Sequence, residues 1–152
     1  MIIGFDCDGV LCDIDVALLY TSHLMTDEEQ ATFDGHYYRS RHPLLNPELL
    51  LAEDDEFIVL TSRHENLRKA TERFLNRFCP NYRRLVMCGD NGWSPESGVM
   101  WEQWNHESCV RKAEKIKELG CDIYIDDSPS NVAFYRKYLN IPIIQYGGRL
   151  GK

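Results

Sequence analysis

Five short apolar runs recur along the chain, and each ends at polar or glycine-containing residues. Continuous apolar runs are typical of parallel strands buried on both faces, whereas half-buried strands alternate apolar and polar residues. We therefore expect five parallel strands. The runs occupy residues 2–5, 57–60, 85–88, 123–125 and 141–146.

Helical patterns fill the intervals between the later runs. Apolar residues at helical spacing predict one helix over 67–78 and another over 110–119. Ser128 followed by Pro129 predicts the start of a third helix, which runs to about Tyr138. This alternation predicts an α/β fold with three layers, a Rossmann-like open parallel sheet of about five strands joined by right-handed crossovers. Function gathers beyond the carboxyl ends of the strands in such sheets.

Residues 13–55 do not follow this alternation. Residues 15–25 could be helical, residues 44–52 could form another turn or two, and a polar and aromatic segment, 36–42, lies between them. We interpret 13–55 as a small helical cap inserted after the first strand and over the site. The alternative is a helical hairpin packed on the sheet edge. The catalytic core would then comprise residues 1–12 and 56–152.

Chain length, apolar content and net charge limit the kinds of binding partner that we expect. The 152 residues and their 43% apolar content suit one compact domain. The net charge of -7 repels polyanions, so nucleic acid is not the expected partner, whereas one bound cation could still recruit a small phosphorylated substrate. The N-terminus has no basic segment followed by a long apolar run, and no stretch is long enough to span a membrane. The oligomeric state stays open.

Cysteine usage predicts a reducing, cytoplasmic environment. A chain of this size folds without disulfides, and the absence of a CxxC pair argues against structural zinc. We expect reduced and mostly buried thiols. The six cysteines are Cys7, Cys12, Cys79, Cys88, Cys109 and Cys121.

The first strand is followed by two carboxylates. Asp6 and Asp8 lie on the same side of an extended backbone, with Cys7 pointing away. Two such carboxylates repel each other unless a cation or proton joins them, and Mg²⁺ favours this ligand set. Gly9 allows a sharp turn beside a ligand. A D-x-D-G segment alone also fits a solvated turn.

Two later strands end in further reactive groups. Asp126-Asp127 follows the fourth run, and a second acidic pair at a strand end is hard to explain as another solvated turn. Thr61-Ser62 follows the second run and offers hydroxyls and backbone amides to a phosphate. The alternative for this pair is a simple helix N-cap before Arg63.

A lysine would complete the set by neutralising phosphate and nucleophile. Lys112 and Lys115 are the candidates in the helix before the fourth strand. Lys112 falls inside the apolar arc of that helix and Lys115 outside it, so we favour Lys112, whose inward position requires a partner. The alternative is that Lys112 extends along the edge of the apolar stripe towards water.

Together these pieces resemble the four motifs of the haloacid-dehalogenase-like phosphohydrolases. The first motif is matched by Asp6-Cys7-Asp8-Gly9-Val10, the second by Thr61, the third by Lys112 and the fourth by Ile125-Asp126-Asp127. The Asp-Gly-Val-Leu sequence and the insertion after the first strand resemble the 5'-nucleotidase and deoxyribonucleotidase branch. The resemblance implies a phosphatase, because Asp8 is an acid that the dehalogenase members lack.

The resemblance also implies roles. Asp6 would be the nucleophile that becomes an aspartyl phosphate, and Asp8 would be the general acid and then the general base. Mg²⁺ would bind Asp6, the backbone carbonyl of Asp8 and Asp127, while Asp126 orients this shell. The groups expected to bind the phosphoryl oxygens are Thr61, Ser62, Arg63 and Lys112.

The sequence thus predicts a Mg²⁺-dependent phosphomonoesterase acting on a small phosphorylated metabolite, with nucleotides among the candidates. One alternative is a nucleic-acid-end 3'-phosphatase, and another is a non-catalytic phosphate-binding or interaction domain. A basic strip would favour the nucleic acid. Its candidate members are Arg39, Arg41, Arg63 and Arg68.

Three tryptophans lie in the stretch from Gly89 to Glu107, which we expect to be a long connection bordering the site. Trp93, Trp101 and Trp104 could stack on a nucleobase, or they could anchor the connection to the core.

Overall fold

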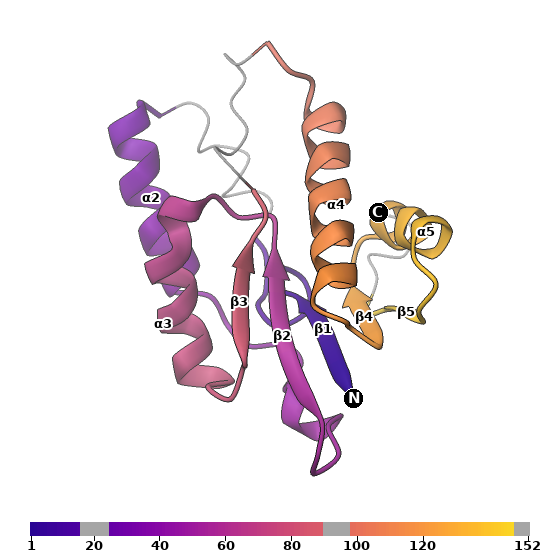
Figure 1. Cartoon of the computed structure of the whole chain (residues 1–152). Helices are drawn as coiled ribbons and strands as arrows, with labels where there is room; N and C mark the ends of the chain where they lie inside the picture. Colours follow the sequence, from indigo (N-terminus) through magenta and orange to yellow (C-terminus); the bar gives the residue numbers. More distant parts are fainter. Residues whose placement is uncertain (16–24, 90–97, 148–152) are drawn as a thin grey trace.

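The computed structural model describes residues 1–15, 25–89 and 98–147. It contains a five-stranded, all-parallel sheet with helices on both faces, as the sequence predicts (Figure 1). The strands are β1 (Ile2–Asp6), β2 (Glu56–Thr61), β3 (Arg84–Met87), β4 (Ile123–Asp126) and β5 (Ile143–Gln145). The helices are α2 (Asp27–Arg39), α3 (Arg68–Phe78), α4 (Trp101–Glu118) and α5 (Pro129–Tyr138), with short 3₁₀ helices η1 (Pro47–Leu49) and η2 (Glu65–Leu67).

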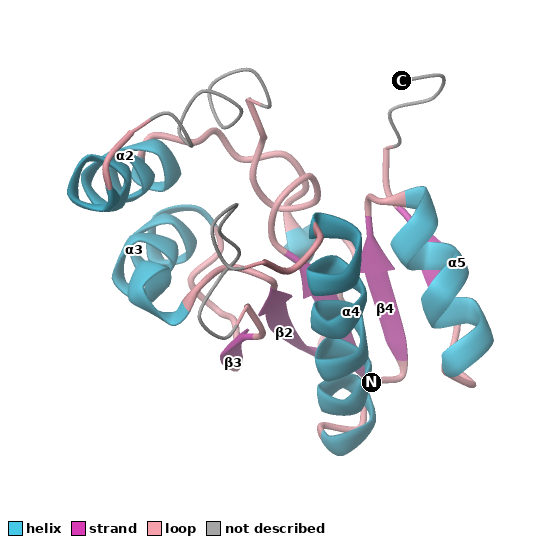
Figure 2. Ribbon diagram, turned by 90° about the horizontal axis from the view of Figure 1, so that it is seen from above, coloured by secondary structure: helices cyan, strands magenta, loops and turns pink. Residues whose placement is uncertain are grey.

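Alternate residues of the strands build the two hydrophobic layers. In β2, Phe57 and Val59 pack in a cluster with residues of α3, whereas Ile58 and Leu60 pack in a second cluster with residues of α4 and α5. Figure 2 shows α3 on one side of the strands and α4 and α5 on the other. The strands are therefore buried on both faces, which explains their continuous apolar runs.

The strand order places β1 at the centre of the sheet. The order is β3-β2-β1-β4-β5, so the chain moves outwards from β1 to β3 and then returns to the other side of β1 for β4. Ligands of open α/β sheets bind at such a reversal, beyond the carboxyl ends of the strands. The last residues of β1 and β4 are Asp6 and Asp126, so this edge is where the predicted chemistry belongs.

The segment 13–55 differs from the expectation in its helices. Helix α2 covers Asp27–Arg39 and includes most of the polar and aromatic segment that we expected between helices. A capping box begins it, because Thr26 accepts from the Glu29 amide and the Glu29 carboxylate accepts from the Thr26 amide. Helix α2 packs beside α3 and η2. The helix expected over 15–25 lies mostly outside the described residues.

Helix α4 begins earlier than its apolar spacing indicates. It starts at Trp101, so Trp101 and Trp104 are helical residues and not part of a connection. The first turns of α4 have few buried residues, and burial begins at Ser108 and Cys109. Apolar periodicity therefore reports only the part of this helix that covers the sheet. Trp93 lies outside the described residues.

The cysteines and the helices agree with two further expectations from the sequence. All six cysteines are buried, with free thiols. None of the described helices combines the length and apolar character that a membrane-spanning segment needs.

Candidate active site

Three carboxylates meet where β1 and β4 end. The two strands pair in parallel with Phe5 opposite Ile125, so the next residues, Asp6 and Asp126, emerge side by side. Carboxylate oxygens of Asp6, Asp126 and Asp127 lie within 4.8 Å of one another. We call these three residues the carboxylate cluster. Asp6 and Asp126 are buried and Asp127 is half-buried.

Lys112 is the lysine at this cluster. Its Nζ donates to Asp6 Oδ1 at 2.9 Å and lies 4.0 Å from Asp126 Oδ2. The side chain is 2% exposed. Lys115, by contrast, pairs with Glu118 at the surface. The position of Lys112 inside the apolar arc of α4 therefore reflects an ion pair with the strand ends, not extension of its side chain towards water.

Burial and charge shape the protonation of these groups. Burial raises the pKa of Asp6 to about 7; Lys112 opposes this shift, and Asp126 and Asp8 add to it. Burial likewise raises the pKa of Asp126. Burial alone would lower the pKa of Lys112, but Asp6 and other negative groups outweigh it and raise that pKa, so the ammonium stays charged. The charged Lys112 ammonium thus stabilises the ionised forms of Asp6 and Asp126, against the effect of their burial.

Asp126 and Asp127 are held differently. Asp126 accepts hydrogen bonds from the Ser128 amide at 3.0 Å and from the Tyr124 hydroxyl at 3.2 Å, so its buried carboxylate is fixed by the protein. Asp127 packs against Gly9, whose φ is +85°. A Cβ at Gly9 would lie 2.2 Å from Asp127 Oδ2. A side chain there would therefore push the Asp127 carboxylate out of place.

The cluster fits a magnesium ion. Its donors are carboxylate oxygens, which Mg²⁺ prefers, and they converge from two adjacent strand ends. Asp8, Cys7 and Cys12 form a second group of close ligand atoms. There, however, the guanidinium of Arg63 already bonds Asp8 and Cys12, so that group holds a cation supplied by the protein.

Asp8 is bound on both oxygens by Arg63. Arg63 Nε donates to Asp8 Oδ2 at 2.9 Å, and an Nη donates to Oδ1 at 2.6 Å. Sequence reasoning expected Arg63 to bind phosphate, but its guanidinium points inwards and is engaged within the protein. Two of its other contacts, Tyr38 and Thr71, could not be predicted from the residues around Arg63, because they come from α2 and α3.

Thr61 and Ser62 end β2 near the same edge. Thr61 is fully buried, and its hydroxyl accepts from the Arg63 amide at 3.2 Å, as in a short turn after the strand. Ser62 is half-buried and accepts from the hydroxyl of Ser108 at 2.6 Å. Ser108 lies one helical turn before Lys112 in α4, so helical spacing from Lys112 would have identified it.

The four arginines of the candidate basic strip all have partners within the protein. Arg68 pairs with Glu65 and Glu72. Arg41 stacks on the ring of Tyr37. With Arg63 bound to Asp8, and Arg39 bonded to His36, every arginine of the strip has a partner inside the protein.

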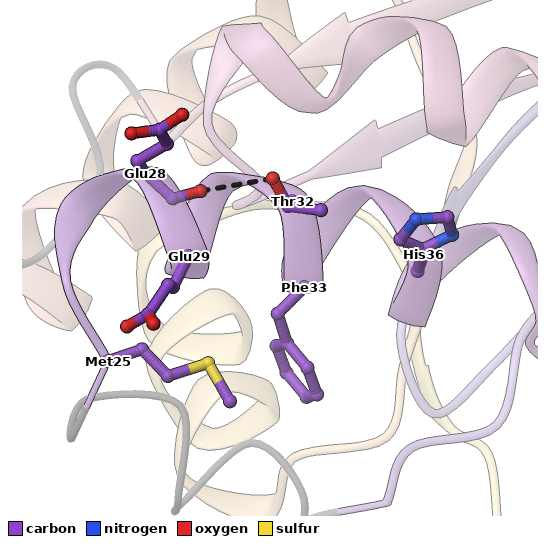
Figure 3. Close-up of a pocket in the computed structure, with 6 residues that line it drawn as sticks. All are labelled: Met25, Glu28, Glu29, Thr32, Phe33 and His36. Atoms are coloured by element: carbon purple, nitrogen blue, oxygen red, sulfur yellow. Dashed lines mark hydrogen bonds between the residues drawn. The ribbon is translucent and has the colours of Figure 1, made fainter.

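A hollow of about 590 Å³ lies elsewhere, along the exposed side of α2 (Figure 3). None of the residues that line it belongs to the carboxylate cluster or to the Asp8 contacts. They are Met25, Glu28, Glu29, Thr32, Phe33 and His36.

Comparisons with known proteins bear on the fold. No protein-family model matches the chain, and no curated protein matches it significantly. Among solved structures, a chain of the Pnkp1/Rnl/Hen1 RNA repair complex has a TM-score of 0.60 and 21% identity over 95% of this chain. This protein spans only 41% of that chain.

A second structure matches along most of its own length. It is a HAD family enzyme from Bacteroides thetaiotaomicron, in complex with magnesium and inorganic phosphate. Its TM-score is 0.54 at 9% identity, over 96% of this chain and 93% of that one. The parallel five-stranded sheet, its strand order and this likeness show that the chain has the haloacid-dehalogenase-like α/β fold.

Proposed function

We propose that this protein is a Mg²⁺-dependent phosphomonoesterase that works through an aspartyl phosphate on Asp6. The observation that carries the proposal is the position of Asp6. It ends the central strand, is held by Lys112, and lies beside two further carboxylates. A buried carboxylate that a lysine orients can act as a nucleophile. Its electrophile would be a phosphoryl group, whose negative charge a bound cation offsets.

The proposed reaction has two halves. The Asp6 carboxylate forms a bond to phosphorus as the ester P–O bond breaks, and Asp8 gives a proton to the leaving oxygen. Asp8 then takes a proton from the water that hydrolyses the aspartyl phosphate, which restores Asp6 and releases phosphate. Lys112 and Thr61 hold the phosphoryl oxygens, with Ser62 beside them. The positive charge of Lys112 is already in place before substrate arrives, so it needs no reorganisation.

Magnesium belongs to this proposal because three carboxylates with oxygen donors, which Mg²⁺ prefers, converge at the strand ends. Asp6 and Asp127 would hold the ion together with the backbone carbonyl of Asp8, and Asp126 would orient the site through its fixed carboxylate. When bound, the ion supplies charge neutralisation on the transferred group. The magnesium and phosphate complex of the HAD family enzyme with the same fold supports this choice of metal.

A small phosphorylated metabolite, with nucleotides included, is the substrate class that we favour. The net charge of -7 disfavours a polyanion, and Arg63 and Arg68 are already paired with carboxylates of the protein. Residues 13–55 are proposed as a small cap, because Tyr38 of α2 stacks on Arg63 and so borders the site. Six buried free thiols fit a reducing cytoplasm.

A nucleic-acid-end 3'-phosphatase is the second candidate. It is favoured by one observation, the likeness in fold to a chain of an RNA repair complex. An acidic protein could still act on a single phosphorylated end, since such an end requires fewer phosphate contacts than an extended duplex.

Release of inorganic phosphate tests both candidates. Purified protein would be assayed with and without Mg²⁺ on an aryl phosphate, a panel of phosphorylated metabolites and nucleotides, and short oligonucleotides carrying a 3'-phosphate. We expect Mg²⁺-dependent release from the small substrates. Preference for the oligonucleotide would favour the second candidate, and no release from any substrate would overturn the phosphatase proposal.

A further inference from the structure

Arg63 is the most extensively bonded charged side chain at the site. Its guanidinium makes four hydrogen bonds, two of them to Asp8. The other two reach the hydroxyl of Thr71 at 2.8 Å and the sulfur of Cys12 at 3.2 Å. The ring of Tyr38 covers its face at 3.9 Å. We call these contacts the Arg63 network.

The network leaves Arg63 behind Asp8 as seen from solvent. The Arg63 side chain is 1% exposed, whereas the Asp8 side chain is 25% exposed. A substrate that enters from solvent therefore meets Asp8 first. Contact between Arg63 and a substrate would require breaking a two-point ion pair whose guanidinium is almost fully buried, which is costly.

The guanidinium is itself fixed from three elements. Thr71 belongs to α3, and its hydroxyl also donates to the Leu67 carbonyl at 2.8 Å, so its oxygen has a defined direction. Tyr38 belongs to α2, and Cys12 to the loop after β1. A planar fork held in this way fixes both the position and the plane of the carboxylate that it binds.

From these contacts we infer that Arg63 is a positioning residue for Asp8 and does not bind the substrate's phosphate. This inference rests on the proposed function, in which Asp8 transfers protons. A carboxylate has about four lone-pair sites, and the two-point contact uses two of them. The Cys12 thiol also donates to Asp8 Oδ1 at 3.6 Å. A site on Oδ2 stays available to a leaving oxygen or a water, and Arg63 determines where it points.

The leaving group distinguishes positioning from phosphate binding. Alkyl phosphates need a proton on the departing oxygen, whereas p-nitrophenyl phosphate has a good leaving group and depends little on a general acid. Arg63→Lys keeps the charge but cannot bind both oxygens of Asp8. We expect kcat/KM for an alkyl phosphate to fall about 10-fold or more beyond the fall for p-nitrophenyl phosphate, because general acid catalysis contributes about 10²- to 10⁴-fold.

A second variant avoids altering the buried ion pair directly. Thr71→Val removes the acceptor for Arg63 while keeping a similar shape, and we expect it to shift the same ratio in the same direction but less. Thr71→Ser keeps the hydroxyl and should retain the wild-type ratio. Hydrolysis of p-nitrophenyl phosphate in the same samples corrects for any loss of folded protein, so a destabilised variant remains informative.

The outcomes separate the two proposals. An equal loss on both substrates in Arg63→Lys, with an unchanged ratio in Thr71→Val, would overturn the positioning role and favour phosphate binding by Arg63. A wild-type protein without Mg²⁺-dependent activity on either substrate would overturn the proposed function and this inference with it. A selective loss on the alkyl phosphate in both variants would support the inference.

Discussion

The two halves of the candidate site differ in how their carboxylates are held. In the carboxylate cluster, three carboxylates converge, and Lys112 bonds Asp6 and lies 4.0 Å from Asp126. In the Arg63 network, one carboxylate meets one guanidinium whose contacts are largely satisfied inside the protein. The first half therefore offers converging oxygen ligands to a cation, whereas the second already holds a cation supplied by the protein. A metal should act on the cluster and leave the Arg63 network unchanged.

The largest expected effect is loss of the nucleophile. Asp6→Asn keeps the size of the side chain but removes its ability to attack phosphorus, so turnover should fall by roughly three orders of magnitude or more. The measurement is Mg²⁺-dependent phosphate release, with circular dichroism to show that the fold is intact. Asp54→Asn, the same change on an exposed turn before β2, is the control and should keep full activity. Substantial turnover in Asp6→Asn would remove Asp6 from its proposed role.

The next effect concerns metal binding by the carboxylate cluster. Mg²⁺ that binds only the folded protein should raise the melting temperature, with a stabilisation of about 2.7 kcal/mol at a concentration 100 times its Kd. Asp127→Ala should reduce this response more than Asp126→Ala. Asp126→Ala should instead lower the melting temperature without metal, because Asp126 accepts two internal hydrogen bonds. Thermal melts with and without Mg²⁺ measure both quantities.

Gly9 offers an independent check of this assignment. Gly9→Ala would place a methyl group against Asp127 and force a left-handed φ on alanine, so it should weaken the Mg²⁺ response much as Asp127→Ala does. A melting temperature indifferent to Mg²⁺ in the wild type would contradict the assignment of a metal to the cluster.

A smaller effect should appear in the pH dependence of the metal-free protein. The pKa of Asp6 is about 7 in the folded protein, against 3.8 as its ordinary value, so the folded state binds more protons than the unfolded state between these values. The free energy of unfolding should therefore fall as the pH rises from about 4 to about 7. Asp126 is shifted in the same direction.

Thermal melts across this range without metal would measure the slope. Asp6→Asn removes one titrating group, so its stability should fall less steeply with pH than that of the wild type. Parallel curves for the two proteins would show that Asp6 does not carry the shifted pKa. Saturating Mg²⁺ should also flatten the wild-type curve, because the ion binds the ionised carboxylates.

The contrast between the carboxylate cluster and the Arg63 network also explains which part of the site could be predicted from the sequence. The carboxylate cluster could be predicted because Asp6 and Asp126 directly follow apolar runs, and parallel strands bring their carboxyl ends to one edge. Lys112 could be predicted because its inward position follows from helical spacing. These inferences use local patterns together with one rule of topology.

The Arg63 network could not be predicted in this way. Arg63 and Asp8 are 55 residues apart, and the direction of a long side chain after a strand end depends on partners from other elements. Tyr38 comes from α2, which apolar spacing does not locate. Thr71 lies in α3, which apolar spacing does locate, but that spacing does not show that the Thr71 hydroxyl meets Arg63. Helix α2 has few apolar positions and contains Gly35, and its clearest signal is the capping box formed by Thr26 and Glu29.

The smallest expected effect concerns substrate selection by the tryptophans of α4. Trp101 and Trp104 stack on each other with ring centroids 5.1 Å apart, and Trp101 is 49% exposed. Figure 1 shows the first turns of α4 rising beyond the carboxyl ends of the neighbouring strands. The pair could therefore present a ring surface to the base of a nucleotide whose phosphate lies at Asp6, or it could simply anchor the start of α4.

Kinetics of Trp101→Ala separate these two roles. Base stacking contributes about 1–3 kcal/mol in single-strand binders, so even the lower value would raise the KM of a nucleotide roughly fivefold. The KM of p-nitrophenyl phosphate, which has no nucleobase, and the melting temperature should stay near wild-type values. Trp104→Ala, at the half-buried partner, should lower the melting temperature as well. Equal losses on both substrates together with reduced stability in Trp101→Ala would assign the pair to anchoring, and base recognition would then have to come from another part of the protein, such as the half-buried Tyr38 of α2.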